Sequence, residues 1–277
     1  MLVANKIALG QIDCGIAGGV DTTSDAPIGV NEGLRQILLQ INRSKGLGDK
    51  LKTLLQLRPG QLKPELPRNG EPRTGLSMGQ HCELMAQTWN IPRDEQDQLA
   101  LDSHRKLAAA YAEGWHDDLL TPFLGLTRDN NLRPDLSLEK LAALKPVFER
   151  SARGTLTAGN STPLTDGASL VLLGSEDWAR ERGLPVLAYL RDGEAAAVDF
   201  VKGAEGLLMA PVYALGSIDR SRLNVKGSSL AAGHPFAATG GRIVANLAKL
   251  LDRAGQGRGL ISICAAGGQG VTAIIER

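Results

Sequence analysis

A cysteine and a histidine in the C-terminal part of the chain are the side chains best suited to chemistry. Cys264 ends an apolar run and precedes the glycine-rich segment 265–270, whose backbone N–H groups can approach a ligand without interference from side chains. His234 lies between Gly233 and Pro235, so its imidazole is held in a defined direction. Imidazole titrates near neutral pH and can activate a nucleophile, which suits acyl chemistry. Two structural alternatives stay open: Cys264 as a small buried hydrophobe and His234 as a capping residue in a turn.

A third candidate is the loop 154–168, a stretch of small and hydroxyl-bearing residues that leads into an apolar strand. Loops of this kind line ligand channels and carry binding residues. Asn160 and Asp166 can equally act only within the loop, because such side chains hydrogen bond to nearby backbone groups and stabilise turns. The loop is therefore either a binding element or a structural turn.

Helices and strands alternate around these three segments. Helices are expected at 2–9, 77–89, 92–113, 176–182 and 240–253, and strands at 13–20, 168–174, 186–191, 260–264 and 271–275. The last two strands flank a glycine-rich turn and predict a hairpin. From Pro27 to Leu76 the pattern loosens and prolines are frequent, so this region is expected to be a surface excursion. The order of elements predicts a layered α/β core with a small helical subdomain.

The composition narrows the class of protein. The 277 residues include 31 lysines and arginines against 30 aspartates and glutamates, which gives no electrostatic reason to expect nucleic acid or an anionic membrane as the main partner. The three cysteines are far apart and show no CxxC spacing, so neither a disulfide framework nor a zinc site is indicated, and a reducing cytoplasm fits best. No secretion signal and no run of about 20 apolar residues is found, which predicts a protein without a membrane span.

Other residues of reactive type are expected to be structural. Cys14 lies in the expected strand 13–20, where its side chain should pack in the core. His81, His104 and His116 lie on or near the polar faces of the expected helices, and we expect all three to be solvated surface residues.

The three candidate segments, taken together, resemble the thiolase family in order and in mutual spacing, apart from a helix that is cut short near Ala214. The matching segments are Ala17–Val20, Ser77–Gly79, Asp94–Asp97, Thr157–Asn160, Asp166–Ala168, Gly233–Pro235, Thr239–Arg242 and Cys264–Gly270. These segments extend over nearly the whole chain. The amino-acid sequences of segments 161–165 and 232–240 most resemble those of the 3-ketoacyl-CoA thiolases of fatty-acid β-oxidation.

The resemblance implies a fold and an activity. The fold is a thiolase-like layered αβαβα protein of the α/β class with a helical loop domain. Residues 1–30 would belong to an N-terminal thiolase half, 31–150 to the loop domain and 151–277 to the C-terminal half. The activity would be the cleavage of a 3-ketoacyl-CoA with CoA to acetyl-CoA and a shortened acyl-CoA, or the reverse condensation, by a ping-pong route through an acyl-cysteine. CoA and acyl-CoA are substrates, and no metal or other cofactor is implied.

The resemblance also assigns roles to individual residues. Cys264 would be the thiol acid/base that exchanges a proton with the acetyl-CoA carbon, and His234 would activate the nucleophilic cysteine. The backbone at Gly267 would help to bind the thioester oxygen. Thr162 would lie at the pantetheine arm of CoA, and Met78 would line the acyl channel.

Two parts of the family pattern are not found in the sequence. The nucleophilic cysteine of thiolases precedes the segment that matches Met1 to Gly10, so the N-terminal half is expected to be incomplete. An Asn-Glu-Ala-Phe or His-Glu-Ala-Phe motif should stand between the segments that match Ala214 and Gly216, where an internal deletion is expected. Three explanations are open: the residues are parts of a longer protein, the gene sequence is defective, or the chain is a non-catalytic descendant.

The partners implied by the resemblance are CoA thioesters, a second copy of the chain in a homodimer or homotetramer, and a hydratase/dehydrogenase subunit. One alternative is a catalytically dead subunit that binds CoA thioesters or has a structural role. A hydroxymethylglutaryl-type or acetoacetyl-CoA synthetase-like condensing enzyme is a second alternative, against which the Cys264 motif argues. A zinc hydrolase that uses Cys264 and His234 would need a third ligand, and the sequence offers none of suitable spacing.

Overall fold

The computed structural model describes residues 1–67, 70–197, 219–265 and 269–277. The chain divides into two compact units, of which the larger consists of residues 1–23 and 70–277 and the smaller of residues 24–69. The candidate site residues all belong to the larger unit.

The larger unit contains a two-stranded sheet formed by distant parts of the chain. Strand β1 (Cys14–Asp21) pairs in antiparallel with β2 (Gly167–Gly174), so that Cys14 lies opposite Gly174 and Asp21 opposite Gly167. Helix α11 (Phe236–Ala254) and the short α1 (Leu2–Ala8) pack against β1. Close approach requires glycine at position 19 of β1, because a Cβ there would lie 2.4 Å from the carbonyl oxygen of Ala237 in α11.

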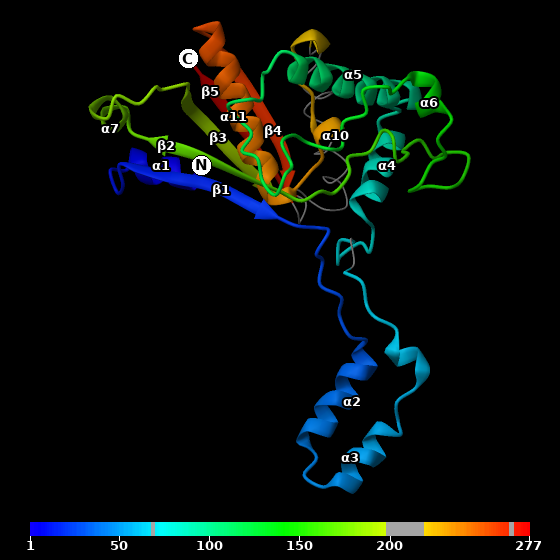
Figure 1. Ribbon diagram of the computed structural model, residues 1–277. Helices are drawn as coiled ribbons and strands as arrows, with labels where there is room; N and C mark the ends of the chain where they lie inside the picture. Colours follow the sequence, from blue (N-terminus) through cyan, green and yellow to red (C-terminus); the bar gives the residue numbers. More distant parts are fainter. Residues whose placement is uncertain (68–69, 198–218, 266–268) are drawn as a thin grey trace. The chain divides into compact units, whose positions relative to one another are not determined.

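A three-stranded antiparallel sheet lies on the other side of α11. Its strand order is β3 (Tyr189–Ala197), β5 (Gln269–Glu276) and β4 (Arg258–Ala265). Helix α11 contacts β1 and β2 as well as β4 and β5, so a helical layer separates two sheets (Figure 1). The predicted hairpin of the last two strands is confirmed, because β4 pairs with β5 from Arg258 opposite Glu276 to Ala265 opposite Gln269.

Four helices form the helical part of the same unit. They are α4 (Met78–Thr88), α5 (Arg93–Ala112), α6 (Leu138–Ala142) and α10 (Ser229–Ala232). Ser77 begins α4 with a capping box, since its hydroxyl accepts from Gln80 N–H while the Gln80 side chain accepts from Ser77 N–H. Ala100, Leu101 and Leu141 form a buried cluster against which Leu230 of α10 packs. This cluster ties α5 to the short helix that directly precedes His234.

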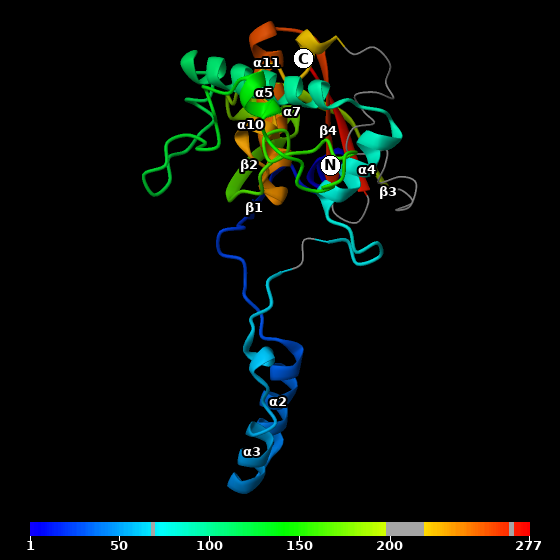
Figure 2. The ribbon, with the colours of Figure 1, turned by 90° about the vertical axis from the view of Figure 1, so that its right-hand side faces the viewer.

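The smaller unit contains α2 (Glu32–Arg43), α3 (Leu47–Leu54) and the 3₁₀ turn η1 (Pro59–Leu62). This segment was expected to be loose surface chain, yet α2 and α3 lie side by side within it (Figure 2). The side chain of Asn31 caps the first helix, and the Glu32–Arg35 ion pair supports its first turn. The prolines of the segment lie outside both helices, so they set the limits of the helices and do not prevent them.

The remaining elements of the larger unit are short: α7 (Glu176–Glu181) and η2 (Arg220–Arg222). Two elements differ in extent from those expected. Helix α11 begins at Phe236 and not near Gly240, because Pro235 suits a helix entry and Gly241 lets α11 approach Ser169 of β2. Strand β3 begins at Tyr189 and extends to Ala197, beyond the expected 186–191. Within the described ranges, no helix combines the length and the apolar character that a bilayer span requires.

Candidate active site around His234

The backbone at His234 is fixed by the loop 154–168. Helix α10 ends at Gly233, whose φ of 94° is a conformation that favours glycine. A Cβ at this position would lie 2.6 Å from the side chain of Thr165, so the turn is also closely packed. His234 N–H donates to the Pro163 carbonyl over 3.0 Å, and Leu164 forms a parallel β-bridge with His234. The sequence placed these two segments 70 residues apart, and the fold joins them.

The imidazole of His234 is half-buried among groups of the α11 N-terminus. Its Nδ1 lies 2.6 Å from Thr239 Oγ1, and its ring meets Phe236 edge-on at 5.0 Å between centroids. The guanidinium of Arg242 donates to the Gly233 carbonyl over 3.0 Å and to Ser229 Oγ over 2.6 Å. Arg242 therefore holds both ends of α10, the short helix that leads to His234.

Burial lowers the pKa of His234 below its ordinary value of 6.5. The positive charge of Arg242 lowers the pKa further, while the carboxylate of Asp21 opposes the shift. Because the pKa is lowered, the imidazole is neutral at neutral pH and has one nitrogen with a free lone pair. A neutral, oriented imidazole is the form that a general base requires.

The N-terminal part of the loop 154–168 is held by a buried carboxylate from α4. Glu83 accepts from Thr155 N–H at 2.8 Å, from Thr155 Oγ1 at 2.7 Å and from Leu156 N–H at 2.9 Å. Both carboxylate oxygens are used, which makes these charge-assisted bonds stronger than neutral ones. Glu83 therefore supplies the acceptors for the backbone N–H groups of Thr155 and Leu156.

Asn160 and Asp97 hold the middle of the same loop. Asn160 Oδ1 accepts from Thr157 N–H over 2.7 Å, and Asn160 Nδ2 donates to Asp97 Oδ1 over 2.8 Å. Asp97 also forms an ion pair with Arg93, which donates to the carbonyl groups of Leu141 and Leu144. The structural interpretation of Asn160, a residue that stabilises its own turn, is thus the one that its contacts support.

Asp166 anchors the far end of the loop to the chain that leaves β1. Its Oδ1 accepts from Thr23 N–H at 2.6 Å and from Thr22 Oγ1 at 3.2 Å. Asp166 thus joins the end of β1 to the start of β2. Both polar residues that the sequence singled out in this loop are engaged in structural hydrogen bonds.

Cys264 is the penultimate residue of β4 and pairs with Gly270 of β5. Burial raises the pKa of its thiol above the ordinary 9.0, so the sulfur carries its proton at neutral pH. Burial raises the pKa of Cys82 of α4 to about 11, and the nearby Glu83 and Cys264 raise this pKa further. Cys264 therefore lies near α4, the helix that Met78 begins.

The remaining predicted site residues, Thr162, Met78 and Gly267, belong to different segments of the chain. Thr162 and Met78 are half-buried, in the loop 154–168 and at the start of α4 respectively. Gly267 and the expected internal deletion near Ala214–Gly216 lie outside the described residues. In the described ranges no hydrogen bond joins His234 to Cys264, and their predicted meeting at one pocket stays a prediction.

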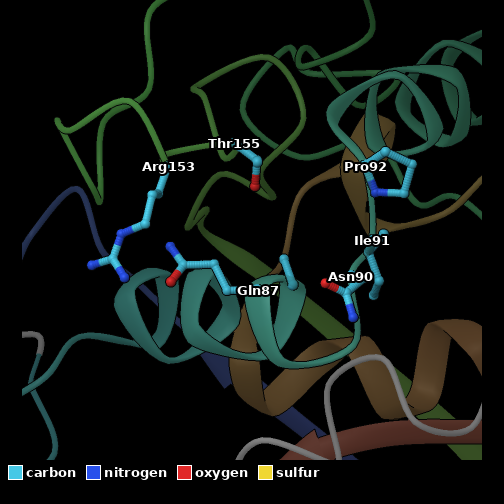
Figure 3. A pocket seen from close by; sticks show the side chains of 7 residues that line it. Gln87, Asn90, Ile91, Pro92, Arg153 and Thr155 are labelled. Atoms are coloured by element: carbon cyan, nitrogen blue, oxygen red, sulfur yellow. The ribbon is translucent and has the colours of Figure 1, made fainter.

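A cavity of about 410 Å³ lies between the end of α4 and the start of the loop 154–168. Figure 3 shows Gln87 and Asn90 on the α4 side and Arg153 and Thr155 on the loop side. None of the predicted site residues lines it. The described part of the chain also contains no group of three or more His, Cys, Asp or Glu side chains that could hold a metal ion.

The prediction that His81, His104 and His116 are solvated surface residues is wrong, because all three are buried. His81 Nε2 lies 2.9 Å from Thr74 Oγ1, and Arg133 N–H donates to His104 Nδ1 over 3.1 Å. Segments outside the helices cover the faces that the helical pattern marks as polar. The order of polar and apolar residues within one helix does not show which other segments pack against it.

Sequence reasoning assigned no role to Glu83, Thr239, Arg242 or Cys82, and none in the site to Asp97. Thr239 and Arg242 lie inside a motif that matched the thiolase pattern, which is the signal that could have drawn attention to them. Glu83 and Asp97 are carboxylates on helices and resemble solvated residues until the loop 154–168 covers them.

Comparison with known proteins gives consistent matches along the chain. The family model described as thiolase, N-terminal domain, matches residues 1–177, and that described as thiolase, C-terminal domain, matches residues 186–277. A 3-ketoacyl-CoA thiolase of Yersinia pestis (strain Pestoides F) is 38% identical over 330 residues, a match that covers 99% of this chain and 75% of the relative. A match of this length exceeds the 277 residues of the chain, so the relative has positions inside the match that this chain lacks.

Solved structures match the fold over nearly the whole chain. The human mitochondrial 3-ketoacyl-CoA thiolase in complex with CoA has a TM-score of 0.78 and 26% identity, covering 98% of this chain and 73% of the human one. The acetyl-CoA acetyltransferase of Bacillus anthracis has a TM-score of 0.80 and 29% identity, covering 100% and 75%.

Proposed function

The chain belongs to the thiolase family, and from this premise we propose that it is an acyl-CoA acyltransferase that cleaves a 3-ketoacyl-CoA with CoA or runs the reverse condensation. The products of cleavage are acetyl-CoA and an acyl-CoA shortened by two carbons. The observation that carries the proposal is the turn at His234, where Thr239 contacts a neutral imidazole while Pro163 and Arg242 hold the backbone on either side of it. Such a base suits a reaction that begins with the removal of a proton from a thiol.

In this proposal His234 and Cys264 have complementary roles. His234 accepts the proton of the attacking thiol, because its lowered pKa leaves a lone pair available at neutral pH. Cys264 is a protonated thiol at neutral pH, so it can donate a proton to the carbanion that forms when the carbon–carbon bond breaks. In the condensation direction the same sulfur would remove that proton from acetyl-CoA.

The remaining site assignments belong to the same proposal. Thr162 would contact the pantetheine arm of CoA, Met78 would line the acyl channel, and the backbone at Gly267 would bind the thioester oxygen. The nucleophile is assigned to no residue of the sequence. Cys14 does not fit this role, since it begins β1 and not a helix.

Finer features of the proposal concern organisation and context. We place the division between the thiolase halves and the loop domain near residues 30 and 150, and the protein in fatty-acid β-oxidation in the cytoplasm. Ile16, Val20, Leu170 and Leu172 are exposed on one face of the sheet of β1 and β2. An apolar face of this kind supports assembly into a homodimer or homotetramer, with a hydratase/dehydrogenase subunit as a further partner.

Thiolysis of acetoacetyl-CoA by the full-length protein, with its intact mass recorded, tests the proposal. If the mass exceeds the 29.3 kDa of this sequence, we expect turnover that Cys264→Ser and His234→Asn each lower by ~10²- to 10⁴-fold, the usual contribution of a general acid or base. If the mass equals 29.3 kDa, we expect weak binding of CoA or acetyl-CoA and no thiolysis, because no residue of the sequence is assigned as the nucleophile. Cys14→Ser is the matched control and should retain activity. Wild-type protein of the larger mass that binds acetyl-CoA but shows no thiolysis would contradict the proposal and favour a subunit that only binds CoA thioesters.

A further inference from the structure

The hydroxyl of Thr239 lies between the imidazole of His234 and a backbone carbonyl. Its Oγ1 lies 2.6 Å from His234 Nδ1 and donates to the Pro235 carbonyl over 3.1 Å. Thr239 is 3% exposed, so no solvent competes for these contacts. Both neighbours belong to the same helix entry, since Pro235 precedes the first residue of α11 and Thr239 follows one turn later.

The two contacts determine which nitrogen of His234 carries its proton. A threonine hydroxyl has a single hydrogen, and a neutral imidazole has one N–H and one lone pair. If the hydroxyl hydrogen points to the Pro235 carbonyl, Oγ1 must accept from Nδ1–H. In the other tautomer the hydrogen would point to Nδ1, and two oxygen atoms 3.1 Å apart would face each other with no hydrogen between them.

We propose that Thr239 is a positioning residue that holds His234 in the Nδ1–H tautomer, so that the lone pair of Nε2 is the base of the reaction. The catalytic part of this inference rests on the proposed function, whereas the tautomer does not. When Nε2 takes the proton of the attacking thiol, the sulfur becomes a thiolate and the ring an imidazolium. Nδ1–H then donates to Oγ1 from a charged ring, which strengthens that hydrogen bond as the proton moves.

The charged groups around the His234 ring do not select its tautomer. Arg242 of α11 and Asp21 of β1 are the charged residues that act on His234, and neither hydrogen bonds to its ring within the described residues. Phe236 presents a ring edge and no hydrogen-bonding group. Thr239 is therefore the described side chain that distinguishes Nδ1 from Nε2.

Two variants of Thr239 form a matched pair. Thr239→Ser keeps the hydroxyl, and Thr239→Val keeps the shape and removes the hydroxyl. The Pro235 carbonyl still accepts from Ala238 N–H and Thr239 N–H, so the valine leaves no carbonyl without a donor. We expect both variants to fold, as checked by their circular dichroism and melting temperatures.

The test is nitrogen NMR of the protein labelled with ¹⁵N-histidine, in which the shifts of the two ring nitrogens report the tautomer. The chain has 4 histidines, and the signals of His234 are assigned by their loss in His234→Asn. Wild type and Thr239→Ser should show Nδ1–H at neutral pH, and Thr239→Val a mixture with Nε2–H. Wild type with Nε2–H, or Thr239→Val with an unchanged Nδ1–H signal, would overturn the inference.

Activity separates this inference from the proposed function. In thiolysis, kcat of Thr239→Val should fall by ~10- to 100-fold with KM nearly unchanged, and kcat of Thr239→Ser should stay within about 3-fold of wild type, because only the valine alters the base. A valine variant with unchanged kcat would contradict the catalytic part. If wild type shows the Nδ1–H tautomer without any turnover, the proposed function fails while the tautomer assignment stands.

Discussion

Asn160→Ala should destabilise the larger unit, because Asn160 completes the hydrogen bonds of the loop 154–168. The substitution leaves the N–H of Thr157, a residue that is 0% exposed, without its acceptor. It also removes the amide group that donates to the Asp97 carboxylate and, over a longer distance, to the Thr155 carbonyl. A buried donor left without a partner costs about 1–3 kcal/mol, and loss of the bond to the Asp97 carboxylate adds about 1.5–3 kcal/mol. We expect the free energy of unfolding to fall by about 2.5–6 kcal/mol.

Urea unfolding followed by tryptophan fluorescence measures this change. Trp89, Trp115 and Trp178 are the 3 tryptophans of the chain, and all belong to the larger unit, so the signal reports the unit that contains Asn160. The matched control is Asn130→Ala, at an exposed position, which should change the free energy by less than about 0.5 kcal/mol. A loss below about 1 kcal/mol for Asn160→Ala would refute the reasoning that this network supports the loop.

The isosteric change Asn160→Asp tests the same network through the pH dependence of stability. It places a carboxylate against Asp97 Oδ1, which now accepts from Asn160 Nδ2 over 2.8 Å. Two carboxylates at this distance cannot both be ionised without a large cost. We therefore expect the deficit relative to wild type to shrink as the pH falls and the pair takes up a shared proton. A deficit that does not change between neutral and mildly acidic pH would contradict this expectation.

Two further predictions concern titrating groups and one strained turn. Burial lowers the native pKa of His104, His116 and His234 below 6.5. The stability that these neutral histidines contribute is therefore fully present above pH 6.5 and is lost as the pH falls toward their lower native pKa values. Melting temperatures should decline on acidification, and a rise would contradict this prediction. Gly233→Ala should lower kcat for thiolysis and the melting temperature together, because φ is 94° and the new Cβ would clash with Thr165, and an unchanged melting temperature would argue against the packing of this turn.

Much of the fold follows from local pattern. The hairpin of β4 and β5 was predictable because two apolar runs flank a glycine-rich turn, and α4 and α5 were predictable from Ser77 and Pro92 at their entries. The start of α11 was not, since the glycines at 240 and 241 suggested a later entry, and only the close approach to Ser169 explains why glycine is needed inside the helix. Helices α2 and α3 were missed because the prolines around them dominated the local pattern.

By itself, the sequence identified His234 and Cys264 as candidates and the thiolase family as their context, because residue types and motif spacing are properties of the chain alone. Only the tertiary structure decided what surrounds these residues. Pro163 lies 71 positions before His234, and Glu83 lies 72 positions before Thr155, yet each pair is joined by hydrogen bonds. The same applies to the burial of His104, which depends on the segment at Arg133 that covers it. Burial and non-local hydrogen bonds arise only when distant segments pack, and they set the protonation state on which the chemistry depends.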